Sequence, residues 1–158
     1  MSTGAFVESR QFLSAAFLHF VALFFRFAFL LAELAVCGTA GGDRDWRLPG
    51  RLDVGYFICA ILVVITGFAR VFFGLKNAHY YFHNPMFYAL LVTCALIELL
   101  SIAPTMEFIK WRKSARGLSG FAPEAAHLKR VRGFMAVELA LFCIAPVFAV
   151  LMVRGLGY

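Results

Sequence analysis

Four long apolar runs dominate the pattern of hydrophobic and polar positions along this chain. They extend approximately over residues 11–37, 53–75, 84–109 and 132–153. About 20 helical residues cross the roughly 30 Å hydrocarbon core of a bilayer, so each run is long enough to span it. None of the runs alternates apolar and polar residues as a strand of a membrane barrel would. Because lipid offers an unpaired backbone no hydrogen-bond partner, the runs are predicted to be helices. The pattern predicts an all-α fold, an integral membrane bundle of four transmembrane helices that forms a single domain over residues 1–158.

The connections between these runs carry signals of helix ends. GTAGGDRDWRLPGRLD is rich in glycine and charge and predicts a solvated turn, with Asp53 as the N-cap of the second helix. The tyrosines and histidines of HYYFHNP suit the headgroup region, and Pro85 suits the first turn of the third helix. Pro123 and Glu124 open a short amphipathic segment before the fourth helix.

Composition supports a membrane location and adds an orientation. Hydrophobic residues make up 62% of the chain, which is more than a soluble domain buries. The formal net charge is +6, and ten lysines and arginines flank or lie in the first and third connections. They are Arg44, Arg47, Arg51, Lys110, Arg112, Lys113, Arg116, Lys129, Arg130 and Arg132, against Arg10, Lys76 and Arg154 on the opposite side.

This asymmetry is the positive-inside pattern. It predicts a multi-pass protein of the bacterial cytoplasmic (inner) membrane, with the basic connections in the cytoplasm and both termini outside. Membrane lipids are the expected partners and nucleic acid is not. The first run lacks the basic start of a signal peptide, so we expect it to be retained. The four cysteines form no close-spaced pair and are expected to be small buried hydrophobic residues.

Ionisable residues recur every seven positions in the first run, at His19, Arg26 and Glu33. A seven-residue step returns to within about 20° on a straight helix, so the three side chains form one stripe. An ionised group that faces lipid costs at least roughly 2.5 to 3.5 kcal/mol at the bilayer centre. The stripe is therefore predicted to face the bundle interior.

The other runs supply polar positions for this stripe, namely Tyr56, Thr66, Arg70, Glu98 and Glu138. At 1.5 Å per residue, Arg26 and Glu98 both lie near mid-membrane and are predicted to form an ion pair. With Glu33 and Glu138 they make the expected intramembrane polar network. The alternative is that these charges only hold the bundle together, since interhelical polar contacts contribute about 0.6 to 2 kcal/mol. For Arg70 and Glu33, which lie near an interface and can snorkel, this structural role is the expected one.

His19 lies in the outer half of the predicted membrane span, where an imidazole can bind a metal or move protons. No HExxH or CxxC spacing accompanies it, which argues against zinc. Haem b needs only one or two axial ligands, so His19 is a candidate ligand of haem iron. Arg26 and Arg70 are then candidates to pair with its propionates.

Three segments resemble a known family: TGFARVFFGLKNAHYYFHNPMF, LSIAPTMEFIKWRK and VELALFCIAP. They are similar to bacterial membrane proteins grouped as domain of unknown function 2214, and the resemblance covers nearly the whole chain. A more remote resemblance is to the membrane-bound, haem-binding protoporphyrinogen oxidases. It implies that His19 is a haem ligand, but Leu90 stands where that family has a functional lysine. An aliphatic residue cannot coordinate iron, which puts a two-ligand site in doubt.

Three functions remain open on the sequence. The first is a haem-associated redox protein that uses His19. The second is a non-catalytic subunit of a larger membrane complex or a homo-oligomer. The third is transport of a proton or small ion along His19, Arg26, Glu98 and Glu33. The sequence does not decide whether the protein is an enzyme.

Overall fold

The computed structural model describes residues 3–38, 45–73, 78–117 and 121–155, with side chains described from Leu13 onward except at residue 117. The helices are α1 (Thr3–Gly38), α2 (Leu48–Phe73), α3 (Ala78–Phe82), α4 (Pro85–Gly117) and α5 (Ala125–Val153). α1, α2, α4 and α5 are each long and apolar enough to cross a membrane. The predicted all-α membrane bundle of four spanning helices is therefore confirmed.

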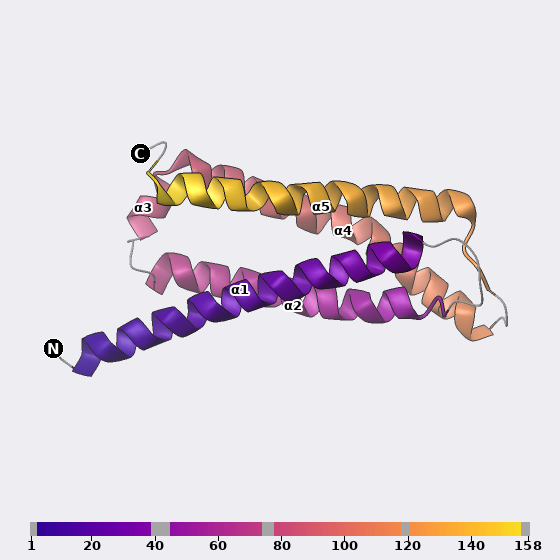
Figure 1. Cartoon of the computed structure of the whole chain (residues 1–158), viewed down its shortest axis with the longest axis horizontal. Coiled ribbons are helices and arrows are strands. Elements are labelled where there is room, and N and C mark those ends of the chain that lie inside the picture. The colour runs from indigo at the N-terminus through magenta and orange to yellow at the C-terminus, as the bar shows by residue number, and fades with distance from the viewer. Residues whose placement is uncertain (1–2, 39–44, 74–77, 118–120, 156–158) are drawn as a thin grey trace.

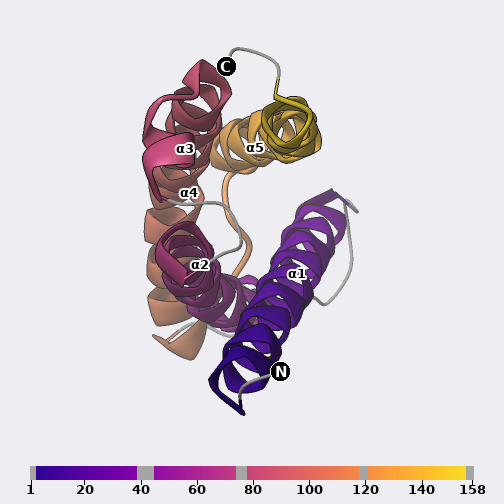
Figure 2. The same ribbon diagram turned by 90° about the vertical axis from the view of Figure 1, so that its left-hand side faces the viewer.

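The spanning helices form two antiparallel hairpins (Figure 1). α1 packs along α2 and α4 packs along α5, while the hairpins meet through α1 with α5 and α2 with α4. Figure 2 shows this arrangement from one end of the bundle. Within the described residues the backbone of α1 does not meet that of α4, nor does α2 meet α5, so these are the diagonal pairs.

The two ends of the bundle differ in character. α1 ends, α2 begins, α4 ends and α5 begins at one end, which we call the basic end (Figure 1). There the Arg47 guanidinium donates to the Ala115 carbonyl at 2.9 Å, and Trp46 packs edge-on against Trp111. Both basic connections thus lie on the same side, as predicted. Arg10, Arg44 and Lys76, on which the orientation also rests, lie outside the residues whose side chains are described.

The opposite end, which we call the α3 end, holds the short helix that the hydropathy pattern did not predict. The Tyr80 hydroxyl of α3 donates to the Met152 carbonyl of α5 at 2.7 Å and ties the two hairpins together. Pro85 begins α4, as predicted, and the Asn84 side-chain oxygen caps it by accepting from the Met86 N–H at 2.9 Å.

Several predicted helix ends are wrong, and for one reason. α1 begins at Thr3 and not near residue 11, α4 continues to Gly117 and not 109, and α5 begins at Ala125 and not 132. Hydropathy marks only the lipid-embedded part of a helix, whereas these helices continue through charged turns beyond it. The predicted end of the second helix at 75 lies outside the described residues, which end that segment at Phe73.

Asp53 is not an N-cap. α2 begins five residues earlier, at Leu48, because Pro49 lies in its first turn, where a missing N–H costs nothing. Asp53 is therefore inside the helix, buried, and its carboxylate accepts a hydrogen bond from the Thr105 hydroxyl of α4 at 2.8 Å.

Two apolar clusters flank the middle of the bundle. The larger lies toward the basic end and contains Leu30, Cys37, Tyr56, Phe108, Trp111, Val131 and Met135. The smaller lies at the α3 end and contains Val71, Phe87 and Met152. Between α1 and α2 the packing depends on Gly55, since a Cβ there would approach the Phe29 ring to 2.5 Å. The polar residues lie between and beside these clusters.

Candidate functional site

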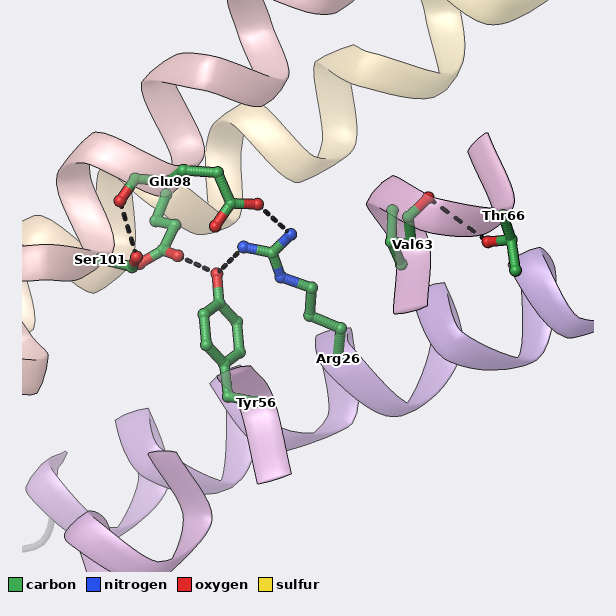
Figure 3. Close-up of polar contacts among 7 residues, drawn as sticks. Arg26, Tyr56, Val63, Thr66, Glu98 and Ser101 are labelled. Atoms are coloured by element: carbon green, nitrogen blue, oxygen red, sulfur yellow. Dashed lines mark hydrogen bonds and ion pairs between the residues drawn. The ribbon is translucent and has the colours of Figure 1, made fainter. Parts of the chain in front are cut away.

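Arg26 is the centre of a polar network that includes all four spanning helices (Figure 3). The residue is only 3% exposed. One terminal nitrogen donates to Glu98 of α4 at 2.5 Å, and the other donates to the Tyr56 hydroxyl of α2 at 2.9 Å. The Tyr56 hydroxyl in turn donates to Glu138 of α5. The ion pair that the sequence predicts between Arg26 and Glu98 is present.

Two contacts of this network cross the bundle on its diagonals. Arg26 of α1 reaches Glu98 of α4, and Tyr56 of α2 reaches Glu138 of α5, although the backbones of these helix pairs do not meet in the described residues. The network therefore crosses the interior of the bundle. The guanidinium also lies 4.5 Å from the Tyr56 ring centroid and 5.3 Å from that of Phe142, within the range of a cation–π attraction.

The two carboxylates beside Arg26 differ in access. Glu138 is 1% exposed, whereas the side chain of Glu98 is 38% exposed. Since an ionised side chain that faces lipid is costly, the open side of Glu98 marks the point where the network can meet water or a polar partner. Glu98 is thus the accessible acid of the network and Glu138 the enclosed one.

A second group of acids lies toward the basic end. Glu33 is 2% exposed, so it does not snorkel to the interface as its position in the sequence suggested. The charges of Asp53 and Glu138 act on Glu33, and its Oε1 has no hydrogen-bond partner. Asp53 is held by Thr105, as described above.

His19 lies apart from the central network, toward the α3 end. Its Nδ1 is 2.9 Å from the Thr66 hydroxyl of α2, which itself donates to the Leu62 carbonyl at 2.6 Å. Because the hydroxyl proton is committed to Leu62, the histidine nitrogen is the donor, which leaves Nε2 with the free lone pair. The spacing His19, Arg26 and Glu33 therefore does place three side chains toward the other helices.

Arg70 does not join the network. Its guanidinium lies over the Phe20 ring at 5.2 Å from the centroid and acts electrostatically on His19. Cys37 and Cys59 are buried as predicted, whereas Cys94 is half-buried and Cys143 is exposed, so burial was wrongly expected for these two. A thiol is apolar enough to face lipid, which removes the need to bury it. In the described part of the chain no three His, Cys, Asp or Glu residues come together as a metal site.

The residues around His19 fit only part of a haem site. Nε2 can make one axial bond while Thr66 holds Nδ1, the arrangement that orients metal-bound histidines in general. Gly67 lies against the ring, where a Cβ would be 3.4 Å from Cε1. Leu90, which stands where the remote family has its lysine, is aliphatic and cannot be the second ligand. The two-ligand site of the remote resemblance therefore does not fit.

Sequence reasoning missed the pair Asp53 and Thr105. The signal was present, because Asp53 precedes Tyr56 by one helical turn and Thr105 follows Glu98 by seven residues, so each shares a face with a network residue. The contact was missed because Asp53 was assigned to the N-cap of the second helix and not to its interior. The central position of Tyr56, which bonds to Arg26 and Glu138 at once, depends on how the helices meet and could not be read from spacing.

Comparison with known proteins identifies a family for this chain. The family model described as "Predicted membrane protein (DUF2214)" matches residues 12–157. Neither the curated proteins nor the solved structures contain a match. Because the matched range includes all four spanning helices and every residue of the network, the chain belongs to the DUF2214 family of predicted membrane proteins.

Proposed function

We propose that this protein transfers protons across its membrane through the network centred on Arg26. The observation that carries the proposal is one buried cation held between two carboxylic acids of unequal access, Glu98 and Glu138. Acids inside a membrane bundle are the residues from which proton relays are built. A network that served only to fix helix register would not need a partly open acid at mid-membrane.

The shared cation couples the two acids. When a proton arrives at Glu98, that carboxylate loses its charge and Arg26 keeps only Tyr56 and, through it, Glu138 as polar neighbours. A proton that leaves Glu138 restores one negative charge beside the guanidinium. Tyr56 links the two events because its hydroxyl accepts from Arg26 and donates to Glu138. The step starts with Glu138 as the neutral acid and Glu98 as the carboxylate, and it ends with Glu98 neutral and Glu138 ionised. One proton has entered, one has left, and Arg26 has stayed charged.

The test is proton flux into vesicles that contain the purified protein. A trapped pH-sensitive dye reports internal pH while a potassium diffusion potential drives protons inward. A hydrogen bond to a charged group contributes about 1.5 to 3 kcal/mol, which corresponds to roughly tenfold or more in a rate. We therefore expect Tyr56→Phe and Glu138→Gln to lower the flux at least about tenfold.

Glu124→Gln is the matched control, since Glu124 is an exposed acid at the start of α5 and outside the network. It should leave the flux unchanged. Wild-type vesicles that conduct protons no faster than empty ones would refute the proposed function. A Tyr56→Phe variant that conducts as fast as the wild type would remove the network from the path.

The side of the membrane that each end of the network faces follows from orientation, and the basic end is proposed to lie in the bacterial cytoplasm. Described basic side chains at that end include Arg47, Arg51, Lys113 and Lys129, and the positive-inside rule favours their retention there. Cysteine placed at Glu124 should react with a membrane-impermeant maleimide only after the cells are opened, in a background with the native cysteines replaced. Cysteine placed at Gly155 should react in intact cells, and the reverse pattern would invert the topology.

A second candidate function is haem-associated redox chemistry, favoured by the orientation of His19. Nε2 of His19 would hold the iron of haem b, with Thr66 fixing the ring, and Arg70 would be the nearby cation for a propionate. The group would supply one-electron chemistry when bound. The purified protein should then show a Soret band that His19→Ala abolishes and that His127→Ala, at an exposed histidine of α5, leaves intact. A spectrum without that band would exclude this candidate.

A further inference from the structure

Glu33 has the least compensated charge of the carboxyl groups described inside the bundle. It lies on α1 two turns from Arg26 and is 2% exposed. Oε1 has no hydrogen-bond partner, and no described cation forms an ion pair with the carboxyl group. A buried polar atom without a partner is rare in folded proteins, so each one needs a physical explanation.

The groups that face Glu33 from the other helices increase its need for a positive charge. Asp53 of α2 and Glu138 of α5 both act on it with like charge. Arg26, the nearest cation of the network, is engaged with Glu98 and Tyr56. From α4, Thr105 is committed to Asp53. The guanidinium of Arg132 of α5 lies near Gly38 of α1, more than a turn beyond Glu33.

The groups around Glu33 favour a proton over a metal ion as its ligand. A metal ion needs several converging oxygens, and no group of three such side chains comes together in the described residues. An ionised carboxylate left alone in a dry interior costs several kcal/mol, and binding one proton removes that cost. A proton is small enough to need only the one free oxygen that Glu33 offers.

We infer that Glu33 is a proton-binding site, which holds a proton on Oε1 as the neutral acid and exchanges it between Glu138 and the basic end of the bundle. The inference rests on the proposed function for the direction of exchange, but not for the protonation itself. In this arrangement Glu98 admits protons at mid-membrane, Glu138 is enclosed, and Glu33 is the next acid toward the basic end. Each exchange moves one proton and changes no other bond.

The test is infrared spectroscopy of the reconstituted protein at neutral pH. A neutral carboxylic acid gives a carbonyl band distinct from that of a carboxylate, and the band shifts in heavy water when its proton exchanges. We expect the wild type to show such a band, Glu33→Gln to lose one component of it, and Glu124→Gln to leave it unchanged. Glu33→Asp, which keeps the acid on a shorter side chain, should shift that component and retain its intensity.

Each result decides the inference. An identical acid band in wild type and Glu33→Gln, or no acid band at neutral pH, would overturn it. A component that vanishes in Glu33→Gln supports proton binding even if vesicles show no flux, in which case only the proposed function fails. If wild-type vesicles conduct, Glu33→Gln should slow the flux while Glu124→Gln does not, and normal flux in Glu33→Gln would remove Glu33 from the path.

Discussion

Replacing Arg26 and Glu98 singly and together measures how strongly the two hairpins are coupled at the middle of the membrane. The variants are Arg26→Met, Glu98→Gln and the double replacement. All three keep side-chain volume close to that of the wild type, so changes in the free energy of unfolding report the polar contact more than packing.

The structure sets the magnitudes. Arg26→Met leaves Glu98 without its cation and Tyr56 without its donor, and breaking a buried pair from one side costs about 3 to 5 kcal/mol. The lower end applies, because the Glu98 side chain is 38% exposed. Glu98→Gln keeps a neutral acceptor for Arg26 and should cost roughly 1.5 to 3 kcal/mol. The double variant leaves neither charge, so its cost should fall short of the sum by at least about 1 kcal/mol.

Reversible unfolding in lipid bicelles, followed by tryptophan fluorescence, gives the three free energies. Interhelical polar contacts in membranes typically show coupling of about 0.6 kcal/mol, so a larger value identifies the pair as unusually strong. The matched control is Lys110 with Glu107, whose atoms are 2.7 Å apart but whose lysine side chain is 62% exposed. That pair should couple by less than about 0.5 kcal/mol. If the costs of Arg26→Met and Glu98→Gln sum to the cost of the double variant within about 0.5 kcal/mol, the reasoning is refuted.

Two further predictions concern helix contacts. Gly55→Ala should lower the free energy of unfolding by about 1 to 3 kcal/mol, because the new methyl group displaces the Phe29 ring. Gly133→Ala is the control, since nothing lies within 4 Å of the added Cβ, and it should be neutral or stabilise the protein by up to about 1 kcal/mol. Equal effects of the two variants on unfolding in bicelles would contradict the packing described between α1 and α2. Thr105→Val removes the hydrogen-bond donor to buried Asp53 and should lower the free energy of unfolding by about 1 to 3 kcal/mol. Thr93→Val is the control: it loses only a bond to the Ala89 carbonyl of its own helix and should change the free energy of unfolding by less than about 0.5 kcal/mol. A Thr105→Val variant as stable as Thr93→Val would show that the hydrogen bond from α4 does not stabilise Asp53.

Most of the fold follows from the sequence because lipid imposes one requirement on every residue of a spanning segment. Length and hydropathy alone locate the four helices, and basic residues place two connections at one end. The same criterion cannot find where a helix ends outside lipid, which is why the starts of α2 at Leu48 and α5 at Ala125 were misplaced. There the backbone continues because Pro49 fits a first turn and AAHLKRV favours a helix.

The site was partly predictable for a related reason. The cost of exposing charge to lipid places Arg26 and Glu98 toward each other, and their equal depth pairs them. Spacing also turns the stripe of α1, including Glu33, toward the bundle interior. It does not show which side chains of the other helices meet one another there, such as Tyr56 with Glu138 or Thr105 with Asp53. These contacts required the structure.

The diagonal geometry of the network has a consequence for synthesis of the protein. Glu98 follows Arg26 by 72 residues and Glu138 follows Tyr56 by 82, so both partners belong to the later hairpin. While the ribosome is still making α4, the α1–α2 hairpin carries the Arg26 guanidinium without its ion-pair partner Glu98. A nascent chain in this condition should remain beside the insertion machinery until the second hairpin arrives, and a fragment truncated before α4 should be degraded in place of accumulating in the bilayer.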